Sequence, residues 1–135
     1  MIHSVVDGAK LRSVMVGSGS KIGKSEVFES VVGTRGTIGD GCLITRTVYM
    51  GADYYEDEKK WTKEVSATNP YIGIGNNCII GKAIIDKNVR IGHNCELLNR
   101  EGVRESMDRI QQGVCIRDGI VIVSKSSVIP DGTKF

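Results

Sequence analysis

The chain has 135 residues, a normal length for a single domain, and 40% of them are hydrophobic. A net charge of +2 is too small to favour nucleic-acid binding, and no apolar run approaches the roughly 20 residues of a membrane helix. We therefore expect no nucleic acid and no membrane among its partners. Glycine is frequent (17) and proline rare (2), which indicates many tight backbone corners rather than disorder.

A six-residue repeat begins near the amino terminus and recurs along the chain. An aliphatic residue is followed by Gly or a small polar residue, two polar residues, a small residue and a free position. The repeat occupies 16–27, 38–49, 74–85 and 85–96, and it closes at 129–133. We predict that the aliphatic residue points into a narrow prism and that the Gly or Asn beside it turns the corner with positive φ.

The small residue four places after the aliphatic one is predicted to point inward as well, since a large side chain would clash there. Cys42, Val48, Cys78, Val89 and Cys95 occupy this place. No two of the chain's four cysteines, the fourth being Cys115, form a CxxC pair. We therefore expect reduced, mostly buried thiols and no metal site.

Three such hexads make a triangular coil of about 18 residues, and coils stack at the strand spacing of about 4.8 Å. Each coil buries its apolar face only against its neighbours. The pattern predicts an all-β parallel β-helix, because a β-sandwich of short strands does not explain a six-residue phase held over several turns.

The hexad phase breaks twice, over 50–71 and over 99–113. The first excursion contains the charged run 56–60, followed by Trp61. In the second, Val103, Met107 and Ile110 recur at helical spacing, which predicts a short helix that packs them against the coil. We interpret the charge runs of both excursions as solvated faces.

Longer stretches of the chain resemble one hexapeptide-repeat family. They are Ser30–Arg35 (SVVGTR), Met50–Glu56 (MGADYYE), Tyr71–Asn77 (YIGIGNN), Ala83–Gly92 (AIIDKNVRIG) and Asp118–Gly132. In this order they resemble, over essentially the whole chain, the carboxyl-terminal domain of plant and cyanobacterial glucose-1-phosphate adenylyltransferases (ADP-glucose pyrophosphorylases). The resemblance implies left-handed winding, which the pattern alone does not give because parallel crossovers are normally right-handed.

The full enzyme of that family makes ADP-glucose and pyrophosphate from ATP and glucose 1-phosphate, for starch and glycogen synthesis. We expect 1–135 to be a single left-handed β-helix domain without the catalytic nucleotidyltransferase domain, because no Gly-rich phosphate loop precedes the first coil. The chain alone is therefore predicted to be non-catalytic. The resemblance further implies a homo- or hetero-oligomer, with the catalytic domain or other subunits of a tetramer as partners. It places a plant or algal protein in the plastid stroma and a bacterial one in the cytoplasm.

The resemblance also implies an allosteric site, at which phosphoglycerate activates and phosphate inhibits. Lys87 and Lys125 match the family's effector lysines, and Arg90 is a weaker candidate neighbour. An ammonium on a rigid coil offers a point charge to a phosphate, and lysines on neighbouring coils would together hold one dianion. The anionic small-molecule effector is the expected ligand, with no catalytic residue, metal or cofactor. The alternative is that these lysines are simply outward-facing and solvated.

Three other functions are compatible with a hexad repeat. A hexapeptide acyltransferase uses a histidine as general base, but His3 and His93 have no evident partner acid in the sequence. A γ-class carbonic anhydrase needs three histidines on zinc, and the chain has two. The third alternative, a stand-alone β-helix scaffold or interaction protein, stays open at the level of sequence.

Overall fold

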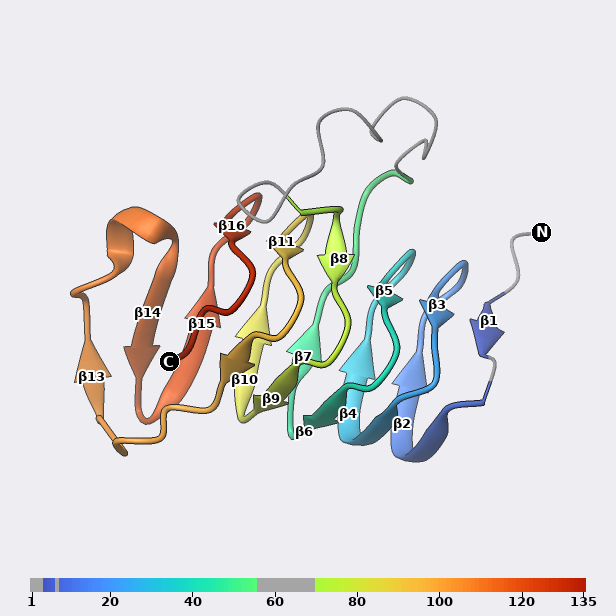
Figure 1. The fold of residues 1–135 in the computed structure, drawn as a ribbon, viewed down its shortest axis with the longest axis horizontal. Helices are drawn as coiled ribbons and strands as arrows, with labels where there is room; N and C mark the ends of the chain where they lie inside the picture. Colours follow the sequence, from blue (N-terminus) through green and yellow to red (C-terminus); the bar gives the residue numbers. More distant parts are fainter. Residues whose placement is uncertain (1–3, 7, 56–69) are drawn as a thin grey trace.

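The computed structural model describes residues 4–6, 8–55 and 70–135, which form a parallel β-helix with three faces (Figure 1). One face is a six-stranded sheet. Its order is β1 (Val5–Val6), β3 (Lys21–Ile22), β5 (Thr37–Ile38), β8 (Gly73–Ile74), β11 (Arg90–Ile91) and β16 (Val128–Ile129).

The other two faces form one ten-stranded sheet, because β2 (Lys10–Val16) and β4 (Glu26–Val32) each run across a corner. Its remaining members are β6 (Leu43–Thr45), β7 (Val48–Tyr49), β9 (Ile79–Gly81), β10 (Ala83–Ile85), β12 (Glu96–Leu97), β13 (Glu105–Ser106), β14 (Val114–Arg117) and β15 (Ile120–Val123). All pairings are parallel except those of β13 with β14 and of β14 with β15.

The core is a set of aliphatic columns inside the prism, which confirms the predicted fold. In-register pairing stacks the same hexad position from coil to coil, so that each side chain covers the one below. One column contains Ile22, Ile38, Ile74, Ile91 and Ile129, each at most 3% exposed. Tyr49 is the large exception among these aliphatic columns, and its complete burial raises the pKa of its hydroxyl to about 12.

The coil is shorter than predicted. Lys21 pairs with Thr37, 16 residues later, and Val27 pairs with Ile44, 17 residues later, where 18 were expected. One corner has lost a residue: within these intervals Glu29 turns it alone in the left-handed region (φ 49°), and Arg46 does so in the next coil (φ 48°). As a result Thr47 takes the inward place at 1% exposure, and Val48, predicted to point inward, is 40% exposed.

The glycines beside the aliphatic residues have a different purpose from the predicted one. Gly75 and Gly92 do not have positive φ; the left-handed residues are Asn77 and Asn94, two places later (φ 59° each). A Cβ on Gly75 would lie 2.7 Å from the carbonyl oxygen of Gly92 in the next coil. These glycines are therefore required for close approach between coils.

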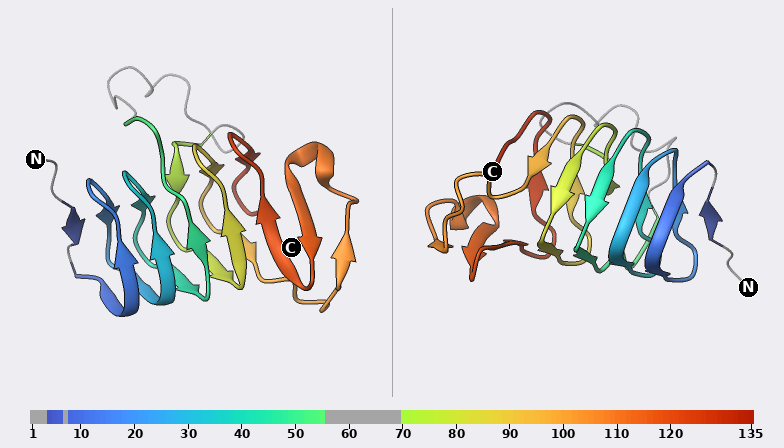
Figure 2. Two further views of the ribbon diagram at one scale, coloured as in Figure 1. Left: turned by 180° about the vertical axis from the view of Figure 1, so that it is seen from behind. Right: turned by 90° about the horizontal axis from the view of Figure 1, so that it is seen from below.

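The predicted helix in the second excursion is wrong. The segment contains a single 3-10 turn, η1 (Ile110–Gln112), which ends at Gly113 in the left-handed conformation (φ 82°). Met107 and Ile110 are 50% and 46% exposed. Strands β13 and β14 instead extend the sheet beyond β15, at the end of the stack away from the amino terminus (Figure 2). Of the first excursion, the charged run 56–60 and Trp61 lie outside the described residues.

All four cysteines are free and buried, as predicted. Three of them donate S–H hydrogen bonds to carbonyl oxygens of the next coil: Cys42 to Gly75 (3.0 Å), Cys78 to Gly92 (3.1 Å) and Cys95 to Pro130 (3.2 Å). The neighbouring thiols of Cys42 and Cys95, together with burial, raise the pKa of Cys78. Cys78, buried and protonated, is therefore structural rather than reactive.

Candidate functional site

Lys87 and Lys125 lie in register at one corner of neighbouring coils. The strands that precede them are paired through Ile85 and Val123, and the backbone N–H of Ser126 donates to the carbonyl oxygen of Lys87 (3.0 Å). Their side chains are 47% and 59% exposed. Since adjacent strands are about 4.8 Å apart, the two ammonium groups are within reach of a single small anion.

A carboxylate already lies between the two lysines. Asp53 Oδ1 is 3.2 Å from Lys87 Nζ, and Asp53 Oδ2 is 3.9 Å from Lys125 Nζ. The side-chain amide of Asn88 donates to Oδ2 (3.0 Å), and Asn88 Oδ1 accepts from the backbone N–H of Asp53 (2.8 Å). The hydrogen bond from Asn88, followed by the contact with Lys87, lowers the pKa of Asp53, which is therefore anionic at neutral pH.

Local geometry explains how Asp53 reaches this position. The corner that carries Lys87 and Lys125 is occupied in the preceding coil by Gly51, whose carbonyl oxygen accepts from the backbone N–H of Asn88 (3.0 Å). Gly51 has φ 83°, and the chain leaves the coil directly after it. Asp53 therefore extends from the coil below the two lysines and lays its carboxylate over them.

Arg90, the third predicted residue, lies on β11. Its guanidinium donates to the carbonyl oxygen of Pro70 (3.1 Å). That contact ties the returning end of the first excursion to the six-stranded sheet. Asp53, by contrast, was not singled out in the sequence, although it belongs to the MGADYYE stretch. The available signal was an acidic residue two places after a corner glycine.

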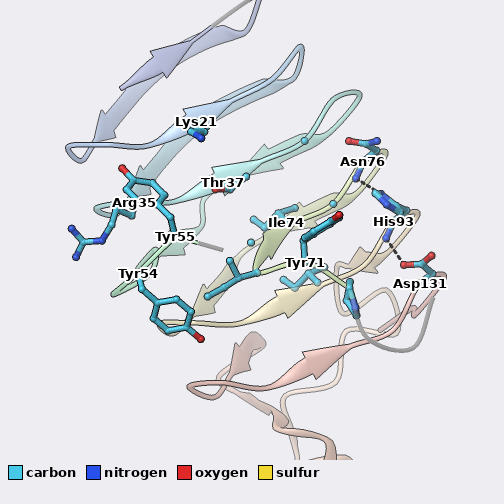
Figure 3. Close-up of a pocket in the computed structure, with 16 residues that line it drawn as sticks. Lys21, Arg35, Thr37, Tyr54, Tyr55, Tyr71, Ile74, Asn76, His93 and Asp131 are labelled. Atoms are coloured by element: carbon cyan, nitrogen blue, oxygen red, sulfur yellow. Dashed lines mark hydrogen bonds between the residues drawn. The ribbon is translucent and has the colours of Figure 1, made fainter. Parts of the chain in front are cut away.

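A separate groove of about 660 Å³ lies on the outer face of the six-stranded sheet (Figure 3). Its walls include Tyr54, Tyr55 and Tyr71 from the two ends of the first excursion. The hydroxyl of Tyr55 donates to the carbonyl oxygen of Gly19 (2.8 Å), and Lys21 Nζ lies 5.5 Å from the centre of the Tyr55 ring. Neither Lys87 nor Lys125 is among the residues that line the groove, so the groove is a distinct feature.

His93 lies at the edge of this groove in a ladder of corner side chains. Its Nδ1 accepts from the backbone N–H of Asn76 (2.8 Å), and its own backbone N–H donates to Asp131 Oδ1 (2.8 Å), as Figure 3 shows. Asp131 therefore contacts the histidine backbone rather than the ring. This arrangement gives His93 a structural purpose and offers no support for an acyltransferase base. His3 lies outside the described residues.

The described part of the chain lacks two further classes of site. Within 4–6, 8–55 and 70–135, no group of three or more His, Cys, Asp or Glu side chains is arranged to hold a metal ion. Over the same residues, no helix is long and apolar enough to cross a membrane.

Comparison with protein families identifies the domain family. Residues 2–134 match the family described as the GLGC left-handed parallel beta-helix domain. The match spans nearly the whole chain and agrees with the resemblance seen in the sequence stretches. It also supplies the handedness, so the parallel β-helix described above is left-handed.

Proposed function

Because this chain belongs to the GLGC family of left-handed parallel β-helix domains from glucose-1-phosphate adenylyltransferases, we propose that it binds a regulatory anion. The site is the corner that carries Lys87 and Lys125. The effector is a phosphate or a phosphorylated small acid such as phosphoglycerate. The parent reaction, formation of ADP-glucose for starch or glycogen synthesis, belongs to the nucleotidyltransferase domain of such an enzyme.

One observation carries this proposal. Two lysines from neighbouring coils converge on a single oxyanion, the Asp53 carboxylate, at 3.2 and 3.9 Å. A phosphate presents oxygens of the same kind with more charge, so the same two ammonium groups are suited to it. The residues are solvent-accessible and stand on rigid coils, which keeps their spacing fixed.

Replacing either lysine should weaken anion binding. We expect Lys87→Ala and Lys125→Ala each to reduce phosphate affinity about tenfold or more, because a hydrogen bond to a charged group contributes about 1.5–3 kcal/mol. Isothermal titration of the purified chain with phosphate measures this. Lys82→Ala is the matched control, since Lys82 is an exposed lysine at a different corner of the same coil. Equal losses of phosphate affinity in all three variants would show that only the net charge of the protein matters. Unchanged phosphate affinity in Lys87→Ala and Lys125→Ala would refute the site.

We also propose that the domain takes part in subunit assembly, through an apolar stripe on the outer surface. Met15, Val31, Val48, Ile84 and Ile122 pair in register across five coils and all point outward. The first three are 72%, 38% and 40% exposed. A contiguous apolar surface of this kind is typical of a protein–protein interface.

A second copy of the chain fits this stripe. Glu29 and Arg46 flank it on adjacent coils, with Arg46 Nε 3.5 Å from Glu29 Oε2. A two-fold axis that crosses the stripe between these coils would place Glu29 of each copy opposite Arg46 of the other. The contact would therefore be complementary in charge as well as apolar.

Val48→Lys should prevent this association, because it places a charge in the middle of the stripe. Sedimentation velocity of the purified chain is expected to show a dimer for the parent and a monomer for the variant. Leu43→Lys is the control, since Leu43 is similarly exposed (37%) but lies on another face of the helix. If the parent chain is monomeric at high micromolar concentration, the stripe does not bind a second copy.

A further inference from the structure

We propose that Asp53 is an intramolecular competitor for the anion site, and that it lowers the affinity of the site for the anions that bind there. The inference rests on the proposed function of Lys87 and Lys125. It assigns to Asp53 a function of its own, as a residue that sets the affinity of the site. Its basis is that the Asp53 side chain supplies the only carboxylate, among the described residues, that contacts both lysines.

Asp53 is held in place by more than the lysines. Its backbone N–H and one carboxylate oxygen form a reciprocal pair of hydrogen bonds with the Asn88 side chain. Asn88 is itself only 9% exposed and sits in the left-handed conformation (φ 62°) that turns the corner. The carboxylate is thus aimed at the lysines by a residue that the fold fixes.

The ion pairs between Asp53 and the two lysines are nevertheless weak enough for an entering anion to break them. All three side chains are about half exposed, and exposed ion pairs of this type contribute little to stability. The 3.9 Å contact to Lys125 is also longer than a good charge-assisted hydrogen bond. Lys125 therefore has donor capacity that a better-placed oxyanion would use.

The cost of displacement is common to all anions. An anion that enters must displace the Asp53 carboxylate whatever its own charge, so the competitor lowers the affinity for monoanions and dianions by the same factor. A preference for a dianion such as hydrogen phosphate or sulfate comes from the two lysines, because twice the charge and additional acceptor oxygens strengthen that contact.

Displacement of Asp53 also has a structural consequence. Asp53 is followed directly by Tyr54 and Tyr55, which form part of the groove wall. When the carboxylate leaves the lysines, the Asn88 amide loses its acceptor and the segment from Gly51 to Tyr55 is released from one of its anchors. Anion binding at the corner is thereby linked to the position of a segment on the neighbouring face.

The test is anion titration of the purified chain and of Asp53→Asn, an isosteric change that keeps the hydrogen bonds to Asn88. We expect Asp53→Asn to bind phosphate about tenfold more tightly, the gain when the open arrangement is a tenth of the population. Asp86→Asn is the matched control, because it makes the same charge change on a neighbouring residue. The Asp86 carboxylate accepts from the backbone N–H of Lys87 (2.7 Å), whereas the Asp53 carboxylate contacts the Lys87 ammonium group. The phosphate affinity of Asp86→Asn should stay within about twofold of the parent.

A second readout follows the Asn88 side-chain amide by ¹H–¹⁵N NMR. In the parent chain, phosphate should shift this resonance as Asp53 departs. If Asp53→Asn binds phosphate no better than the parent while Lys87→Ala abolishes binding, the competitor inference is wrong and the anion site stands. If neither the parent nor Asp53→Asn binds phosphate at millimolar concentration, both the inference and the proposed function fall.

Discussion

Gly33→Ala is expected to destabilise the domain by at least about 3 kcal/mol, more than an ordinary overpacking substitution. A Cβ at this position would overlap the carbonyl oxygen of Met50 and lie 2.5 Å from its carbonyl carbon. Both atoms belong to the backbone of the next coil. The backbone N–H of Gly33 also donates to the carbonyl oxygen of Tyr49 (2.6 Å), so the coils cannot separate without loss of that ladder.

Urea unfolding followed by circular dichroism measures this effect, and Gly81→Ala provides the matched control. Gly81 has no positive φ either, and its added Cβ would lie 3.1 Å from Leu98 Cδ2, the end of a side chain that can rotate. We expect Gly81→Ala to change stability by less than about 1 kcal/mol. Similar midpoints for the two variants would show that coil spacing tolerates a methyl group, contrary to this reasoning.

Ile85→Ala should cost about 2–5 kcal/mol, the usual range for a buried Ile replaced by Ala. Ile85 is completely buried and pairs in register with Tyr49 on one side and Val123 on the other. The cavity would therefore weaken contacts with two neighbouring coils. Because coils contact only their neighbours, loss at a central coil divides the stack instead of shortening it.

The adjacent residue gives an internal comparison. Ile84 has the same side chain on the same strand but points outward, where it is only partly buried. Ile84→Ala should cost about 1 kcal/mol or less. Chemical denaturation of both variants, with the parent as reference, decides the matter. Equal losses for Ile84→Ala and Ile85→Ala would contradict the assignment of inside and outside on β10.

Much of the fold was predictable because the hexad repeats a physical constraint. An aliphatic residue at a fixed phase must be buried at every coil, so Ile38, Ile74 and Ile91 were placed correctly from sequence alone. The predicted inward position of Val48 was wrong because Arg46 alone turns the preceding corner, in the left-handed conformation. Nothing in the hexad pattern indicates that a charged residue adopts this conformation. The helix predicted from Val103, Met107 and Ile110 was also wrong, since helical spacing over a short segment does not ensure a helix.

The candidate site was predictable only in part. Lys87 and Lys125 were chosen by resemblance, and the parallel register brings them to the same corner of adjacent coils. Asp53 was missed because 34 residues separate it from Lys87, and only the return of the chain by whole coils brings the two together. A contact of this kind depends on coil length and on the residues inserted in the excursion, neither of which the hexad pattern specifies.

Strand β14 has a further consequence for the molecule as a whole. It lies antiparallel against β15, so the next position along that face is already filled by a strand of the opposite direction. A parallel ladder is a template that another chain can extend in the same direction, as happens in fibril growth. Here β14 runs opposite to the strands that it covers, and the exposed edge is β13, which pairs with β14 over only two residues. An edge strand this short gives another chain little to pair with, so this end of the stack resists end-to-end polymerisation.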